Sequence, residues 1–395
     1  MQPGNNANQD RIHLTHTADE PGKHMGAVVA PIFINSLHVF DTIEEFEELD
    51  GYAYDKYLYG RDCNPTVAVL EQKLAALEHG TRATVFASGM AACTAAIMAT
   101  CKAGSHIICI SDTYTTIRDA IKRVFAPRFG MSFSFVSGLD MEELELAIRE
   151  NTDLIMLESP ASMYFRGMDL RAIAAVARRH GIKTYIDNTN ASPIFQKPLD
   201  LGIDIVMHST SKYISGHSDA IGGVLITKDD ELNRILVEDI REHVGGIMGP
   251  MEAYLTTRGL RTLEIRMHAY YKTGLAVAEY LERHPKVRKV FYSGLASHPQ
   301  AELLAGQQTG HGGLMSFLLN VETVEEARAF VNRLQLFGRG GSWGGYESLV
   351  LLPFHGVGQE DMDMMGADPR LIRIYCGLEG ADHLIADLEQ ALEGV

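Results

Sequence analysis

The sequence predicts an α/β protein built on a mostly parallel central sheet, followed by a smaller C-terminal α+β portion. From residue 61 to 258, short apolar segments alternate with segments of helical spacing, as in a parallel sheet covered by helices. The length of 395 residues exceeds what one hydrophobic core normally holds and indicates two domains. The pattern changes near residue 259, where we place the domain boundary.

Residues 1–60 have little apolar periodicity and end in a tyrosine-rich stretch, residues 52–59. We therefore expect an extended arm rather than a packed domain in this segment. Three parts are predicted in all: the arm at 1–60, a central domain at 61–258 and a C-terminal domain at 259–395.

The elements of the central domain are predicted from apolar runs and from helix-end signals. Asp140 and Glu143 have the spacing of a capping box at the start of a helix. Gly181 is a typical C-terminal residue for the helix at 169–179. The expected order is a helix at 67–77, a strand at 83–87, a helix from 89 to 99, a strand at 106–110, a helix from 141 to about 148, a strand at 153–158, a helix at 169–179, and strands at 183–187 and 203–207.

The C-terminal domain is predicted from fewer signals. A long helix at about 262–284 leads into it, a strand is expected at 372–375, and a helix at 383–392 closes the chain.

Composition excludes several classes of protein. A net charge of −16 argues against nucleic acid or an anionic membrane as a partner, and no apolar run reaches the length of a membrane span. The N-terminus is polar and lacks a signal-peptide core. Five cysteines without a C-x-x-C suggest reduced thiols and a cytoplasmic location. Sixteen histidines without an H-E-x-x-H indicate no metal site.

Four polar residues fall at or just beyond the ends of predicted strands: Ser88, Glu158, Asp187 and Lys212. In a parallel sheet the carboxyl ends of the strands meet at one edge, where ligands bind. We therefore expect these side chains to converge on one site.

Lys212 carries the most specific chemistry of the four. It follows the apolar run 203–207, with the hydroxyls of Ser209 and Ser211 before it and a glycine-rich turn after it. A buried amine is a good nucleophile toward aldehydes because desolvation lowers its pKa. Pyridoxal phosphate (PLP) requires such an amine, hydroxyls for its phosphate and a carboxylate for its ring nitrogen, and Asp187 would supply that carboxylate. A solvated surface lysine is the alternative.

Two segments that follow predicted strands fit the same cofactor. Ser88, Gly89 and Met90 begin a helix directly after a strand, and the free N–H groups of a helix N-terminus bind phosphate. An ordinary serine-capped turn would have the same sequence. Tyr114 would either stack on a flat cofactor ring or pack in the protein interior.

Two further segments suggest an amino-acid substrate. Arg373 lies among apolar residues, and a buried guanidinium needs an anionic partner, such as a substrate carboxylate. A structural salt bridge is the alternative. Ser342 and Trp343 precede two glycines that let the backbone approach a ligand, although a tight turn over a buried indole explains the pattern equally well.

Taken together, six motifs resemble the Cys/Met-metabolism family of fold-type I PLP-dependent enzymes, from about residue 26 to the C-terminus. Within this family the chain is most similar to the bacterial cystathionine β-lyases. The motifs lie at residues 59–61 with 64–66, 88–90, 158–160, 187–189, 209–219, and 371–373 with 377–379.

The resemblance implies a role for each matching residue around PLP. Lys212 would join the cofactor as a Schiff base and then move substrate protons. Asp187 would hold the pyridinium proton, and Tyr114 would stack on the ring and assist proton transfer. The implied phosphate-binding residues are Ser88, Gly89, Met90, Ser209 and Ser211.

The resemblance also implies substrate contacts and an oligomer. Arg373 would bind the substrate carboxylate, with support from Ser342 and Trp343. Tyr59 and Arg61 would reach the cofactor phosphate of a neighbouring subunit, which requires at least a dimer. The family implies a homotetramer formed from two dimers.

The reaction type rests on fewer residues. Trp343 and Ser162 fit the β-lyases, whereas γ-enzymes usually carry leucine and asparagine at these positions. The 64–66 motif is shared by both groups, and Ser211 replaces a usual threonine. Asn190 stands where an apolar or aromatic residue is common, which puts the natural substrate in doubt.

The resemblance therefore implies a PLP-dependent carbon–sulfur lyase. Its expected reaction is β-elimination of cystathionine or a related S-substituted cysteine to a thiol, pyruvate and ammonia. The alternative is a γ-lyase or a γ-replacement enzyme. A transaminase fits the motifs less well. A catalytically idle regulatory protein is disfavoured because Lys212, Asp187, Tyr114 and Arg373 are all present.

Overall fold

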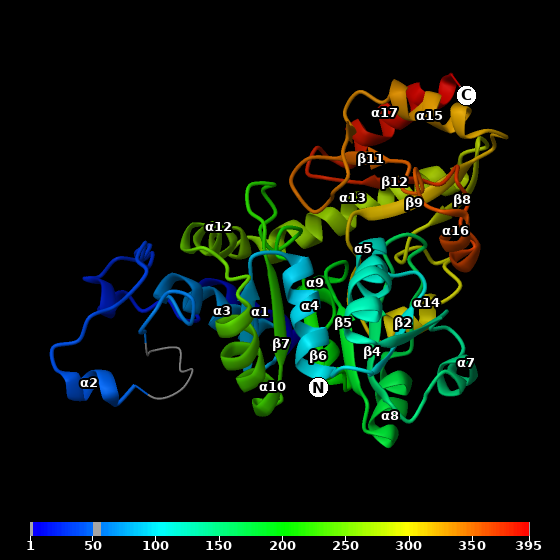
Figure 1. Ribbon diagram of the computed structural model, residues 1–395. Helices are drawn as coiled ribbons and strands as arrows, with labels where there is room; N and C mark the ends of the chain where they lie inside the picture. The colour runs from blue at the N-terminus through cyan, green and yellow to red at the C-terminus, as the bar shows by residue number, and fades with distance from the viewer. Residues whose placement is uncertain (1–2, 50–56, 395) are drawn as a thin grey trace.

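The structure, a computed structural model, describes residues 3–49 and 57–394 and contains two β-sheets (Figure 1). Residues 1–2 and 50–56 of the predicted arm therefore lie outside the described residues. The larger sheet has the strand order β1-β7-β6-β5-β4-β2-β3, and the smaller has the order β10-β11-β12-β9-β8. The larger sheet is mostly parallel, which confirms the predicted fold class: β3, β2, β4, β5 and β6 run in one direction, and β7 is antiparallel to both β6 and β1.

The strands of the larger sheet are short apolar runs with both faces covered. Alternate residues belong to two separate cores: Ile108 and Ile155 face one, while Ile107 and Leu154 face the other. Such burial on both faces explains why these strands are almost continuously apolar. The bounds are β1 (Arg82–Phe86), β2 (His106–Ile110), β3 (Ser132–Val136), β4 (Thr152–Glu158), β5 (Lys183–Asp187), β6 (Ile205–His208) and β7 (Gly223–Thr227).

Helices pack on both faces of this sheet. Residues of α3 and α8 belong to the core on one face, and residues of α4 and α5 to the core on the other. The bounds are α3 (Pro65–Leu77), α4 (Gly89–Thr100), α5 (Thr115–Ala120), α6 (Ala126–Phe129), α7 (Met141–Leu146), α8 (Leu170–His180), α9 (Ser192–Phe195), α10 (Asp230–Arg234), α11 (Glu242–Val244) and α12 (Pro250–Leu260).

One predicted helix signal is wrong in detail. Asp140 caps α7 by accepting a hydrogen bond from the Glu142 backbone, but the capping box with Glu143 does not form. The Glu143 carboxylate instead accepts hydrogen bonds from the backbone and hydroxyl of Ser137. Glu143 therefore bonds Ser137, outside the helix, instead of the Asp140 backbone that a capping box requires.

The smaller sheet has its own core, to which residues of α13, α15 and α17 contribute, and these helices lie beside it in the upper part of Figure 1. The long predicted helix is α13, which leads into this part of the chain. The predicted boundary at residue 259 stays a prediction. The bounds are β8 (Val287–Phe291), β9 (Leu314–Leu319), β10 (Gly338–Arg339), β11 (Leu349–Leu351), β12 (Ile372–Tyr375), α13 (Leu263–Arg283), α14 (Ala301–Ala305), α15 (Val324–Arg333), α16 (Gln359–Met365) and α17 (Ala381–Glu393).

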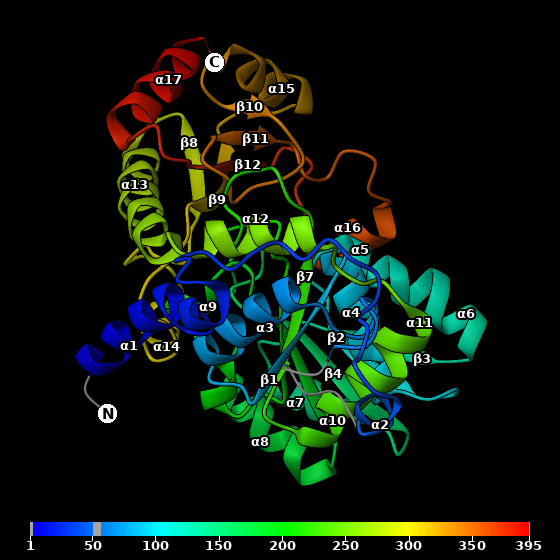
Figure 2. The same cartoon turned by 90° about the vertical axis from the view of Figure 1, so that its left-hand side faces the viewer.

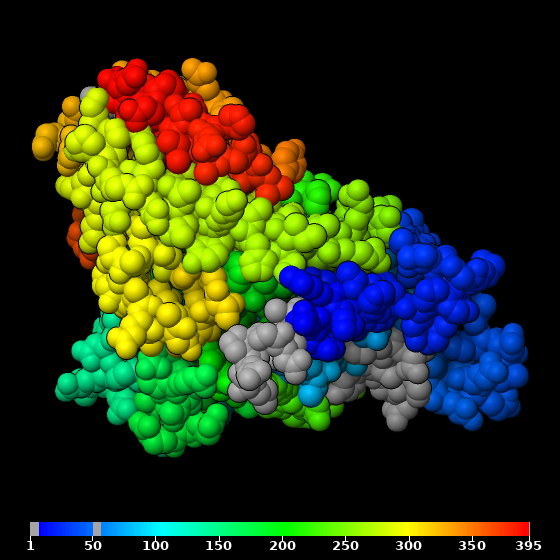
Figure 3. Space-filling model, turned by 180° about the vertical axis from the view of Figure 1, so that it is seen from behind, coloured from blue at the N-terminus to red at the C-terminus, as the bar shows by residue number. Residues whose placement is uncertain are grey.

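The N-terminal segment is only partly extended. It begins with α1 (Pro3–Thr15), which lies beside α3, and it also contains α2 (Ile43–Glu47) (Figure 2). Leu14 is buried, and ion pairs join Asp10 to Lys197 and Arg11 to Glu264. These partners are distant in sequence, so no local periodicity reveals the helix. Seen from behind, the segment lies on the outside of the molecule (Figure 3). No helix among the described residues is long and apolar enough to cross a membrane.

Candidate active site

One cavity of about 350 Å³ brings together all but two of the residues predicted to bind cofactor or substrate. Its walls come from the carboxyl ends of β4, β5 and β6, from the start of α4 and from β12 of the smaller sheet. The predicted residues that line it are Ser88, Gly89, Met90, Tyr114, Asp187, Ser209, Ser211, Lys212, Ser342, Trp343 and Arg373. Glu158, Ser162 and Asn190 line it as well.

Lys212 lies in the turn after β6 and reaches across to the smaller sheet. Its Nζ donates a hydrogen bond of 2.6 Å to the Ser342 hydroxyl and lies 5.6 Å from the centre of the Trp343 ring. Burial lowers the pKa of the amine, and the positive charge of Arg373 lowers it further, whereas Asp187 opposes this shift. The amine is therefore closer to the neutral, nucleophilic form than a solvated lysine.

Asp187 ends β5 and is fixed by the residue two positions on. One of its carboxylate oxygens accepts hydrogen bonds from the backbone and the hydroxyl of Thr189. Burial raises the pKa of Asp187, while Thr189, His208 and Lys212 act in the opposite direction. Since the two Thr189 donors and the Lys212 charge favour the carboxylate form, Asp187 is suited to pair with a protonated ring nitrogen.

The start of α4 forms a cradle with the two serines before Lys212. Ser88 caps the helix by accepting a hydrogen bond of 3.0 Å from the Ala91 backbone, so the predicted cap is present. A Cβ at Gly89 would lie 3.0 Å from the Ser209 hydroxyl, which shows how closely the helix start faces that side chain. Ser211 accepts a hydrogen bond of 3.0 Å from the Gly222 backbone. Hydroxyls and helix N–H groups of this kind suit a phosphate.

Glu158 fastens two loops of the cavity to the end of β4. Its carboxylate accepts a hydrogen bond of 2.8 Å from the Tyr114 backbone and another of 2.8 Å from the Ser162 backbone. Burial, followed by the charge of Asp187, raises the pKa of Glu158 to about 8. Burial and the neighbouring Asp187 charge therefore both favour the protonated form of Glu158.

This shift predicts a pH dependence of stability. The folded state holds a proton on Glu158 that the unfolded chain releases near pH 4.5. The stabilisation is therefore complete below the unfolded pKa of 4.5 and is lost as the pH rises to about 8. Urea unfolding of the cofactor-free Glu158→Gln variant should show a free energy of unfolding that falls less steeply across this range, by up to about 1.4 kcal/mol per pH unit. The exposed Glu142→Gln variant should keep the wild-type slope, and a wild-type slope in Glu158→Gln would contradict the assignment.

Arg373 is a buried cation without a carboxylate partner. It lies on β12 with 7% of its surface exposed, and its guanidinium donates to the Met163 sulfur at 3.7 Å. Among the described residues no ion pair includes it, so the structure shows no salt bridge of the kind considered as the alternative. Burial lowers its pKa to about 10, a shift that the nearby Glu158 opposes. A buried guanidinium of this kind suits a ligand carboxylate.

The turn that carries Trp343 depends on a glycine. Gly344 has a φ of +95°, and a Cβ at this position would lie 2.9 Å from the Lys212 backbone. A larger residue would therefore push the turn away from the lysine. Trp343 packs edge-on against Tyr213 at a ring separation of 5.2 Å. The turn consequently lines the cavity and also contacts the protein interior, and its role toward a ligand stays a prediction.

Tyr114, Ser162 and Asn190 are placed by hydrogen bonds of the main chain around them. Tyr114 lines the cavity and is 47% exposed. The amide of Asn190 donates a hydrogen bond of 3.3 Å to the Pro160 carbonyl. Stacking by Tyr114 stays a prediction.

Tyr59 and Arg61 do not reach this cavity. They line a separate hollow beside Asn35 and Met248, and the Arg61 guanidinium lies 5.2 Å from the Tyr59 ring centre. A role toward a neighbouring subunit requires this outward placement, and that role stays a prediction.

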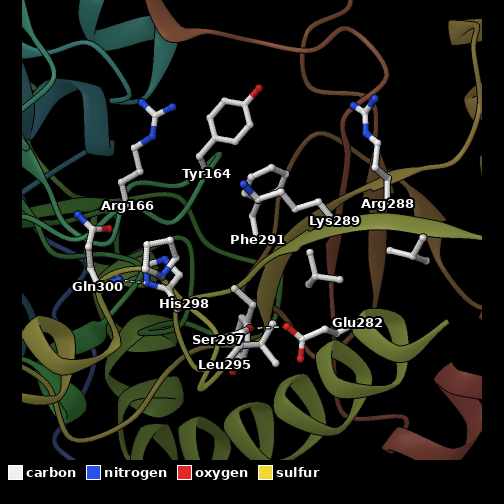
Figure 4. A pocket seen from close by; sticks show the side chains of 14 residues that line it. Tyr164, Arg166, Glu282, Arg288, Lys289, Phe291, Leu295, Ser297, His298 and Gln300 are labelled. Atoms are coloured by element: carbon white, nitrogen blue, oxygen red, sulfur yellow. Dashed lines mark hydrogen bonds between the residues drawn. The ribbon is translucent and has the colours of Figure 1, made fainter. Parts of the chain in front are cut away.

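A second cavity, of about 490 Å³, lies between the loop after β4 and the smaller sheet (Figure 4). Several of its polar groups bond within the chain: Arg288 pairs with Asp368, Ser297 donates to Glu282, and Gln300 bonds to the Gly167 backbone. None of the predicted site residues lines it.

The comparison with known families agrees with this arrangement. Residues 11–393 match the model of the Cys/Met metabolism PLP-dependent enzymes. The chain belongs to this family. It is 38% identical to a cystathionine gamma-lyase of Dictyostelium discoideum over 97% of this chain and 96% of that protein. It is 36% identical to cystathionine beta-lyase MetC of Bacillus subtilis over the same shares of the two chains.

A solved structure supports the fold as well. The crystal structure of metB from Corynebacterium glutamicum superposes with a TM-score of 0.91 at 34% identity, covering 98% of both chains. The protein is thus a fold-type I, PLP-dependent carbon–sulfur lyase. The amine, buried carboxylate, helix N-terminus and hydroxyls of the cavity fit PLP. Among the described residues no group of three or more His, Cys, Asp or Glu side chains is placed to hold a metal ion.

Proposed function

We propose that this lyase catalyses β-elimination on cystathionine or a related S-substituted cysteine, releasing a thiol, pyruvate and ammonia. The observation that supports this reaction is the contact between Lys212 and the Trp343 turn. The amine is bonded to Ser342 at 2.6 Å and lies 5.6 Å from the Trp343 ring centre. A β-elimination needs one substrate proton removed, from Cα, whereas a γ-elimination also needs a proton removed from Cβ. An indole beside the amine restricts the second movement.

The residues of the cavity divide the proposed work. PLP, when bound, accepts the electron pair that is left when the Cα proton departs. Lys212 removes that proton through Nζ, and Arg373 fixes the substrate carboxylate and thereby the direction of Cα. Asp187 keeps the ring nitrogen protonated, while the start of α4, with Ser209 and Ser211, holds the phosphate. Tyr114 would stack on the cofactor ring and assist the proton transfer.

A γ-elimination is the second candidate, because several relatives carry that name. These include the Dictyostelium discoideum protein and an L-methionine gamma-lyase of Fusobacterium nucleatum that is 35% identical over 94% of each chain. Such an enzyme would release 2-oxobutyrate in place of pyruvate.

The product formed from L-cystathionine distinguishes the two reactions. Purified, PLP-loaded protein should release pyruvate, and the Trp343→Leu variant should shift the product ratio toward 2-oxobutyrate by about tenfold or more, since it frees the space beside Lys212. Mass spectrometry of the 2-oxo acids provides the measurement, and the exposed Leu336→Ala variant is the control. If the wild-type protein releases mainly 2-oxobutyrate, the β-elimination proposal is wrong and the γ-lyase takes its place.

We also propose that the protein works in the cytoplasm as a homotetramer, with Tyr59 and Arg61 completing the site of a neighbouring subunit. Exposed apolar side chains of the N-terminal segment support such contacts, among them Met25, Val28 and Val39.

Mixing two inactive variants tests this shared site. Arg61→Ala and Lys212→Ala should each be inactive alone. After co-refolding, half of randomly formed dimers pair one chain of each kind and contain one intact site, so about a quarter of wild-type activity should return. Activity that stays at the level of the single variants would show that Arg61 does not act across the interface.

A further inference from the structure

A buried ion pair lies behind Asp187, outside the cavity. The Glu78 carboxylate, just after α3, is 2.5 Å from Nε2 of His208, the last residue of β6. Both side chains are almost completely buried, with 0% and 1% of their surfaces exposed. The second oxygen of Glu78 has no hydrogen-bond partner among the described residues. Burying two charged groups is costly, so the pair calls for a role beyond packing.

The position of the pair connects it to the ring-nitrogen partner. The Asn188 amide, next to Asp187, donates a hydrogen bond of 2.9 Å to the same Glu78 oxygen that bonds His208. β5 and β6 are neighbours, with Asp187 opposite Met207, so His208 is adjacent to that rung of the sheet. A positive charge on His208 would favour the ionised form of Asp187.

The other charged and titratable groups around Asp187 cannot take the place of His208 as a source of positive charge. Glu158, on β4, carries the opposite influence and disfavours a second negative charge. Lys212 favours the carboxylate, but its amine is the group that the cofactor consumes. Cys93 and Tyr185 also face Asp187, and burial keeps both in their neutral forms. A protonated His208 would therefore be a source of positive charge beside the Asp187 carboxylate that the cofactor does not consume.

We propose that Glu78 holds His208 as an imidazolium behind Asp187, and that this pair keeps Asp187 ionised and aimed at the ring nitrogen of the cofactor. Glu78 and His208 are thus positioning residues that act through Asp187. The inference rests on the proposed role of Asp187 and deepens it.

The test compares two carboxylates, the buried Glu78 and the partly buried Asp204, that connect the same pair of strands at opposite ends. Glu78→Gln and His208→Gln remove the charge pair at the carboxyl ends of β5 and β6. Asp204→Asn is the matched control, because Asp204 accepts hydrogen bonds of 2.8 and 2.7 Å from Thr184 at the opposite ends of these strands. All three variants are compared as PLP-loaded protein, with thermal unfolding as the measure of structural damage.

Two readouts report on the cofactor without turnover. In Glu78→Gln and His208→Gln the pH midpoint of the visible cofactor absorption should rise by about one unit. A less positive ring withdraws fewer electrons from the nitrogen that joins it to Lys212, which makes that nitrogen more basic. The dissociation constant for PLP should rise about tenfold. Asp204→Asn should change neither quantity, even where its unfolding temperature falls as far.

Each other outcome overturns the inference. If Glu78→Gln and His208→Gln match Asp204→Asn in both readouts, or if neither folds while Asp204→Asn does, the pair is only structural. Asp187→Asn separates this from a failure of the proposed site. An Asp187→Asn variant with a wild-type midpoint and PLP affinity would remove the role of Asp187 itself, whereas changes confined to that variant would remove only the role of the Glu78–His208 pair.

Discussion

Replacing Lys212 with alanine is expected to lower turnover of the lyase by roughly 10³- to 10⁴-fold. In the proposed mechanism the amine has two tasks, since it would bind the cofactor covalently and move the substrate proton. Arg373, the other cation of the cavity, stays protonated because its pKa is about 10. The measurement is the release of 2-oxo acid under saturating substrate, together with the intact mass after borohydride reduction, which should show no covalent PLP.

A surface lysine provides the control for this variant. Lys228 pairs with Asp200 at 2.9 Å and leaves 47% of its side chain exposed, so Lys228→Ala should keep wild-type turnover and covalent PLP. If Lys212→Ala retained a tenth of wild-type activity, the assignment of the catalytic amine would be wrong.

Replacing Arg373 with leucine is expected to reduce kcat/KM by at least roughly 30-fold, which corresponds to about 2 kcal/mol or more of lost binding to a substrate carboxylate. The effect should appear mainly in KM, because the guanidinium binds a part of the substrate that does not react. The kcat/KM of Arg373→Lys should lie between the values of the wild-type protein and Arg373→Leu, since an ammonium cannot make the paired hydrogen bonds of a guanidinium.

The control lies three residues away. Arg370 pairs with Asp368 at 2.8 Å, so Arg370→Leu removes a structural ion pair and should leave KM unchanged. Steady-state kinetics with the cofactor absorption recorded in parallel separates the two roles. Equal KM values for Arg373→Leu and the wild-type protein would show that another group binds the carboxylate.

The larger sheet and most of its site could be predicted from the sequence because the signals are local. A buried apolar strand precedes Ser88 and another precedes Lys212, while Asp187 is the last residue of a third. Parallel strands bring their carboxyl ends to one edge of the sheet. Most helices around this sheet also have clear periodicity or caps, such as Asp169 before α8.

Features that depend on distant partners could not be predicted in this way. The antiparallel β7 pairs with β1 and β6 across long stretches of chain, and no local pattern specifies that direction. Glu78 and His208 are separated by 130 residues, so neither position indicates the other. The open choice for Arg373 depended on whether a carboxylate lay nearby, which only the fold determines.

Lys212 lies in the turn after β6 of the larger sheet, whereas Arg373 lies on β12 of the smaller sheet, and each sheet has its own main hydrophobic core. The distance between the Lys212 amine and the Arg373 guanidinium therefore depends on how the two sheets pack against each other, and not only on these two side chains. Substitutions far from the cavity, where the two sheets pack together, can therefore change the distance between Lys212 and Arg373. Substrate preference in such an enzyme can therefore diverge during evolution while every residue that touches the substrate stays the same.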